Sequence, residues 1–109
     1  MQRGELWTVA GGPHYTGKPR PVLIIQDVRY DATDSVTVIP LSSTEVPAPL
    51  FRVAIPARKP TGLAADSFVL VEKITTDSRA KLRSPLGRVS DQQLVAVDRA
   101  MIVFLGLAD

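Results

Sequence analysis

Hydrophobic and polar residues alternate along most of this chain, in a pattern typical of short β-strands that bury one face. Residues that favour turns separate the alternating segments at close spacing. The strands expected from this pattern are residues 4–10, 20–26, 35–41, 50–55, 66–74 and 86–89. We expect Pro40 to lie at the end of its strand, because proline cannot donate a hydrogen bond to a sheet ladder.

The polar segments between these strands predict loops. Residues 11–19 contain three glycines and two prolines, which do not hold a regular element. Residues 28–35 are polar and rich in turn residues, and residues 75–84 are expected to form a short turn or a single helical turn.

The end of the chain changes to a helical period. Ser90 is placed as an N-cap, and Gln93 is placed to complete a capping box. Gly106 can terminate the helix. One helix face is expected to be apolar and to carry Leu94, Val97, Met101, Phe104 and Leu105. The elements together predict a mainly β fold, a small and strongly bent sheet or partly open barrel with a C-terminal helix packed on it.

Composition limits the domain count and the chemistry. With 109 residues the chain is long enough for a single domain, residues 1–109. It has no cysteine and one histidine, so disulfides, thiolate metal sites and a zinc site built on histidines alone are excluded. We therefore expect no metal and no cofactor. The first residues lack an apolar signal core and no apolar run could span a bilayer, which predicts a cytoplasmic protein without a membrane partner.

The most informative pattern joins Arg20 to a cluster of hydroxyl residues. Arg20 stands at the mouth of one expected strand, and Ser42, Ser43 and Thr44 follow the end of the next. Pro21 restricts Arg20 to extended geometry, which favours a preorganised side chain. If the two strands pair, a cation and a hydroxyl share one groove, a combination that suits chemistry on a phosphodiester. The alternative reading is a solvated charge beside a turn whose hydroxyls bond their own backbone.

Other candidate residues have two readings each. His14 is the only imidazole and lies in the glycine-rich loop, so it is either an acid/base group or a surface histidine. In a continuous strand Glu72 and Lys73 would point to opposite faces, so one of the two would sit at the rim of the core, as a general base or in a structural ion pair. Trp7 and Tyr15 could stack on nucleobases. The alternative for Trp7, in the first expected strand, is a place in the core. The sequence contains no Walker-type phosphate-binding loop, no dinucleotide-binding fingerprint and no Gly-x-Ser-x-Gly nucleophile elbow.

The chain resembles the MazF/PemK toxins of bacterial toxin–antitoxin modules along nearly its whole length. The order and spacing of several short segments carry the resemblance: Arg3 to Trp7, Arg20 to Ile25, Val38 to Ser43, Thr61 to Leu63 followed by Asp66 and Ser67, and Leu86 to Ser90.

The resemblance implies a homodimer of SH3-like barrels, each of five to seven strands with a C-terminal helix, that cleaves single-stranded RNA without a metal. The family's active-site arginine and hydroxyl correspond to Arg20 and Ser42, where the family usually has threonine. The expected products carry a 2′,3′-cyclic phosphate and a 5′-hydroxyl. The proton acceptor stays open between Glu72, His14 and water.

Substrate binding is expected at residues around these two positions. They are His14, Lys18, Ser43, Glu72 and Lys73. The family often has a further arginine where this chain has Thr75, and Lys73 could substitute for its charge.

The resemblance also implies an antitoxin partner. We expect a cognate acidic antitoxin that competes with RNA near Arg20, Lys18 and Lys73. The alternatives are a gyrase poison similar to CcdB and a non-catalytic SH3-like binding module. The chain ends without the tryptophan that CcdB toxins use, which argues against the first of these.

Overall fold

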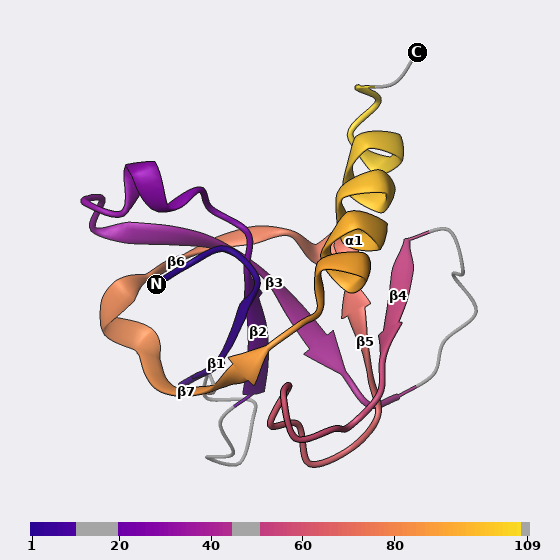
Figure 1. Ribbon diagram of the computed structural model, residues 1–109. Helices are drawn as coiled ribbons and strands as arrows, with labels where there is room; N and C mark the ends of the chain where they lie inside the picture. The colour runs from indigo at the N-terminus through magenta and orange to yellow at the C-terminus, as the bar shows by residue number, and fades with distance from the viewer. Residues whose placement is uncertain (11–19, 45–50, 108–109) are drawn as a thin grey trace.

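The computed structural model describes residues 1–10, 20–44 and 51–107, which form a bent antiparallel sheet of seven strands and one C-terminal helix (Figure 1). The strands are β1 Glu5–Val9, β2 Arg20–Ile24, β3 Ser35–Ser42, β4 Arg52–Ile55, β5 Ser67–Leu70, β6 Thr75–Ser78 and β7 Leu82–Arg88, and the helix α1 is Asp91–Phe104. Short 3₁₀ turns occupy η1 Val28–Tyr30, η2 Val71–Lys73 and η3 Arg79–Lys81. The predicted mainly β fold with a C-terminal helix is confirmed.

Strand β3 is the centre of the sheet, whose order is β4-β5-β3-β2-β1-β7. On the side away from β2, the first half of β3 pairs with β6 and its last two residues pair with β5. Pro40 lies inside β3 and not at its end, so that expectation was wrong. On this side of β3 the pairing with β6 ends at Val38 and the pairing with β5 begins at Leu41. Pro40 therefore lies in the gap between the two partner strands.

The single strand expected over residues 66–74 is also wrong. Strand β5 ends at Leu70, η2 follows, and a separate strand β6 starts at Thr75. Both strands use the same side of β3, so the chain must step along β3 between them. Buried Val71 anchors this step, and its N–H donates to the carbonyl of Phe51 at 2.9 Å. Glu72 and Lys73 therefore do not alternate on a strand.

Strand β7 starts four residues earlier than the pattern predicts, at Leu82. Residues 83–85 are exposed, and they include Pro85, so alternation is lost there. β7 is the last strand in the sheet order, and an edge strand tolerates proline because one side needs no ladder partner.

Helix α1 has the predicted ends. The Ser90 side chain accepts from the Gln93 N–H at 3.1 Å, and the Gln93 side chain accepts from the Ser90 N–H at 2.7 Å. Gly106 follows the helix with φ of 71°, the left-handed conformation that glycine adopts most readily. This capping box and terminating glycine fix where the helix starts and stops.

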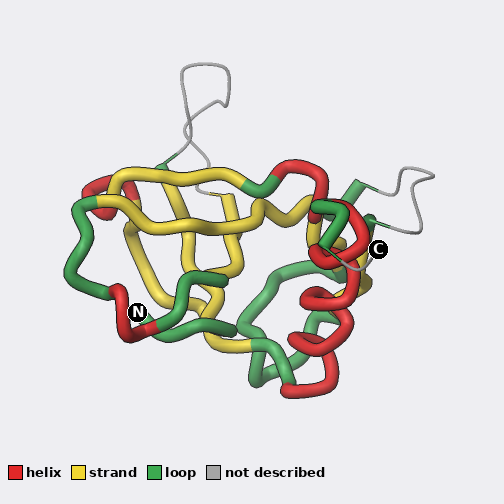
Figure 2. The backbone as a smooth tube through the Cα atoms, turned by 90° about the horizontal axis from the view of Figure 1, so that it is seen from above, coloured by secondary structure: helices red, strands yellow, loops and turns green. Residues whose placement is uncertain are grey.

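The core consists of two buried clusters. The larger contains Leu6, Leu23, Ile39 and Val69 and extends to Val97 and Ala100 of α1, which lies along one side of the sheet (Figure 2). The smaller is built from β2, β3 and β7, with Trp7 packed against it. The C-terminal half of α1 passes beyond the sheet, so most of its apolar side chains are exposed.

Candidate active site

Strand pairing brings the predicted arginine and hydroxyl residues into one groove. Val22 of β2 pairs with Pro40 of β3, and continuing that antiparallel register by two residues sets Arg20 opposite Ser42. Both side chains line a groove of about 570 Å³, together with Ser43 and Thr44. Arg20 is the exposed first residue of β2 and Ser42 is the half-buried last residue of β3. Two strand ends thus hold a cation and a hydroxyl cluster side by side.

The Ser42 hydroxyl has a defined orientation. Its Oγ accepts a hydrogen bond from the backbone N–H of Thr44 at 3.1 Å. This contact occupies an acceptor position of the oxygen, so the hydroxyl proton is available to an acceptor in the groove. Ser42 is therefore suited to donate to a phosphate oxygen.

The groove is also lined by a segment that the polarity pattern did not single out. Residues Gly62–Ala65 contribute to it, with Leu86 of β7 beside them and Pro21 and Leu41 on the strand side. This segment belongs to the connection between β4 and β5, drawn at the bottom of Figure 1. The only sequence signal for it was the Thr61-Gly62-Leu63 motif shared with the toxin family.

Four other predicted site residues fall in different places. His14 and Lys18 lie outside the described residues. Glu72 and Lys73 lie on η2, and neither is among the residues that line the groove. The Glu72 carboxylate accepts from Arg52 at 2.8 Å and 3.2 Å, the structural ion pair that was one of its two predicted readings. Lys73 is exposed.

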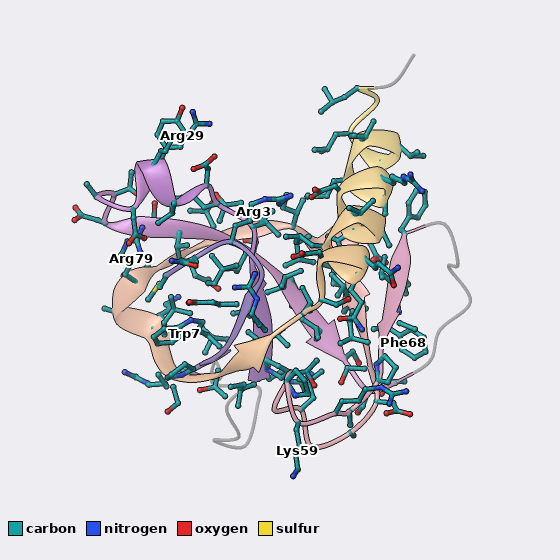
Figure 3. The ribbon with its side chains drawn as sticks, viewed as in Figure 1. Arg3, Trp7, Arg29, Lys59, Phe68 and Arg79 are labelled. Carbon is teal, nitrogen blue, oxygen red and sulfur yellow. The ribbon has the colours of Figure 1, made fainter. Side chains whose placement is uncertain are left out.

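Trp7 packs against the core, which was one of the two roles considered for it. It is partly buried against the smaller core cluster, and its Nε1–H donates to Glu5 at 3.0 Å (Figure 3). Tyr15 lies outside the described residues. In the described ranges there is no group of three or more histidine, cysteine or acidic side chains that could hold a metal ion. Nor does that part of the chain contain a helix with the length and hydropathy needed to cross a membrane.

Comparison with known protein sequences gives a match over almost the entire chain. Residues 2–105 match the family described as the PemK-like, MazF-like toxin of type II toxin–antitoxin systems. A similar protein is the probable endoribonuclease MazF of Mycolicibacterium smegmatis, which is 48% identical over 108 residues. The aligned region covers 99% of this chain and 99% of that protein.

Solved structures share the fold. An endoribonuclease in complex with its cognate antitoxin, from a mycobacterial species, has a TM-score of 0.81 at 24% identity, with 100% of this chain and 98% of that chain covered. The Mycobacterium tuberculosis toxin MazF-mt6 has a TM-score of 0.77 at 25% identity, with 95% of this chain and 97% of that chain covered.

Proposed function

The chain belongs to the family of PemK-like and MazF-like toxins of type II toxin–antitoxin systems, and we propose that this toxin endoribonuclease cleaves single-stranded RNA in the groove between Arg20 and Ser42. The observation that carries the proposal is the shared groove, whose lining includes the arginine and the hydroxyl residue together. Neither a CcdB-like gyrase poison nor a non-catalytic binding module has comparable support.

The proposed reaction uses the nucleophile that RNA already carries. Water takes the proton of the 2′-hydroxyl, the 2′-oxygen forms a bond to the phosphorus, and the bond from phosphorus to the 5′-oxygen breaks. The 5′-oxygen takes a proton from water, and the products are a 2′,3′-cyclic phosphate and a 5′-hydroxyl. Negative charge builds on the non-bridging phosphate oxygens in the transition state. Arg20 offers a planar fork of charged donors to these oxygens, and Ser42 offers a neutral donor fixed by Thr44.

The groove suits charge stabilisation better than proton transfer. Its described lining residues include no carboxylate. Glu72 of η2 forms an ion pair with Arg52 of β4 and is not among the residues that line the groove, so we give Glu72 no role in moving a proton. Arg20 itself does not deprotonate readily and serves as a fixed positive charge. We therefore assign Arg20 and Ser42 to positioning the phosphate and to stabilising its transition state.

The test is RNA cleavage in excess EDTA. We expect folded protein to cut long single-stranded RNA under these conditions, because Arg20 supplies the positive charge at the phosphate. The upstream fragments should end in a 2′,3′-cyclic phosphate and the downstream fragments should begin with a 5′-hydroxyl that polynucleotide kinase labels directly. Failure to cut any of several long RNAs would contradict the proposal.

We also propose two protein partners and a cytoplasmic location. The first partner is a second copy of this chain. The second is a cognate antitoxin with an acidic segment that binds near Arg20 and competes with RNA, since both ligands are anionic and seek the same cation. Support for the second comes from a structure of the same fold, which is an endoribonuclease bound to its cognate antitoxin. RNA as substrate fits the cytoplasm.

A further inference from the structure

The wall of the groove that faces the strand ends presents no polar side chain over residues Gly62–Ala65. Leu63 is buried, and the exposed residues Ala64 and Ala65 carry only methyl side chains. Lys59 of the same connection is at its outer tip and points away from the barrel (Figure 3). The charged residues of this connection, Arg58, Lys59 and Asp66, do not line the groove. Any polar contact that this wall makes with a substrate must therefore come from its main chain.

This wall is held rigidly against β7. Gly62 has φ of 68°, and a Cβ atom there would lie 2.0 Å from the carbonyl oxygen of Leu86. A Cβ on Gly87 would lie 2.2 Å from the carbonyl oxygen of Pro60. The Arg88 N–H donates to that same Pro60 carbonyl at 2.7 Å. Two glycines thus allow two backbone segments to touch directly.

Thr61 fixes the segment from within. Its side chain is buried, and its hydroxyl donates to the carbonyl of Arg58 at 2.9 Å. The same oxygen lies 3.4 Å from the N–H of Leu63, which donates to it. The backbone that follows Thr61 is therefore preorganised before any ligand arrives.

The main chain of this rigid segment keeps unused hydrogen-bonding groups. Among the described residues, no partner bonds to the N–H of Ala64 or Ala65, or to the carbonyl oxygens of Gly62, Leu63 and Ala64. The carbonyl of Ala65 is engaged, because the Ser67 hydroxyl donates to it at 2.9 Å. Donors and acceptors therefore stand side by side on one wall, which is the arrangement that an unpaired base edge can match.

We infer that the main chain of Gly62–Ala65 reads the base of a nucleotide next to the scissile phosphate. This inference rests on the proposed RNA cleavage. With the phosphate between Arg20 and Ser42, a neighbouring base lies against the facing wall, where Leu86 offers an apolar surface to its ring. The methyl side chains of Ala64 and Ala65 let the base edge approach the backbone. The sequence preference at this one nucleotide is then set by loop shape and not by side-chain chemistry.

The test removes one main-chain donor at a time. Ala64→Pro and Ala65→Pro each delete an N–H that has no partner in the described fold, and Lys59→Ala, on the same connection but outside the groove lining, is the control. The probe is an RNA pool with a randomised window, whose cut sites are sequenced. Rates are then compared on two oligonucleotides that differ only at the base beside the cut.

We expect each proline variant to lose about two- to tenfold of its discrimination at one position of the motif, the amount expected for one hydrogen bond. The other motif positions should keep their preference, and Lys59→Ala should match wild type. If a proline variant does not fold, Ala65→Leu takes its place, since its bulk holds the base away from the backbone.

Two results separate the possible failures. Folded variants with the wild-type preference at every motif position would overturn the reading of the base by this wall and leave RNA cleavage intact. A wild-type protein that cuts no RNA in the pool would remove the proposed function, and this inference with it.

Discussion

Arg20 and Ser42 are expected to contribute to the rate of cleavage and little to folding, because Arg20 is exposed and Ser42 closes a strand end. Arg20→Ala should lower kcat about 10²–10³-fold, as loss of a preorganised charge-stabilising donor does. Ser42→Ala should impair cleavage, and Ser42→Thr should largely retain it because the oxygen remains. Single-turnover cleavage of one RNA measures all three variants.

The matched control is Arg99→Ala, which removes an exposed arginine of α1 that is not part of the groove. It should cleave at the wild-type rate with an unchanged circular dichroism spectrum. An Arg20→Ala protein that is as active as this control would show that the phosphate is held elsewhere.

At the residue scale the sequence predicted that Arg20 and Ser42 line one groove, because both flank apolar strands that are consecutive along the chain. It could not choose between the two roles considered for Glu72, because its partner Arg52 lies twenty residues away, on strand β4. The pairing of these side chains depends on the β4–β5 register, and no local pattern encodes that register.

At the element scale the elements with local signals were predictable and those that depend on pairing partners were not. The capping box and the terminating glycine define α1 within the sequence itself. Strand β6 is short and polar, Thr75–Ser78, and it is a strand only because the first half of β3 lies beside it. Its alternation is absent from the sequence, so residues 75–84 read as a turn, which is right only for η3.

The contact between the β4–β5 connection and β7 gives a stability prediction. Gly87→Ala should lower the free energy of unfolding by about 1–3 kcal/mol, because the new methyl group meets the Pro60 carbonyl and the Thr61 backbone, which cannot move aside cheaply. Thermal and denaturant unfolding followed by circular dichroism measures it.

Ser84→Ala serves as the control on the same strand. Ser84 is exposed, and only its main chain bonds to Thr8. It should unfold as wild type does. Equal stabilities for the Gly87 and Ser84 variants would mean that the two backbone segments can separate without cost.

At the scale of the whole molecule, exposed apolar side chains concentrate at one end. Among the described residues, most large exposed hydrophobic side chains lie on α1 or the turn after it: Val95, Ile102, Val103, Phe104, Leu105 and Leu107. Phe104 is partly covered, since its ring packs edge-on against the ring of Phe51, with the two ring centroids 5.3 Å apart. The rest of this helix end projects past the sheet (Figure 1), and contiguous apolar surface of this kind marks an interface.

We expect this end of α1 to be buried against a second copy of the chain, as the proposed homodimer requires. Val103 is 59% exposed, so Val103→Asp changes the surface without opening a cavity in the core. A charge placed at an apolar interface loses its hydration without gaining a partner, and the dimer should dissociate. Light scattering at micromolar concentration should give a dimer mass for wild type and a monomer mass for Val103→Asp. The matched control is Val28→Asp, because Val28 is 50% exposed and belongs to η1, which is drawn well apart from α1 in Figure 1. That variant should stay dimeric. A monomeric wild type would contradict the homodimer itself. A dimer that Val103→Asp leaves intact would place the interface away from this end of α1.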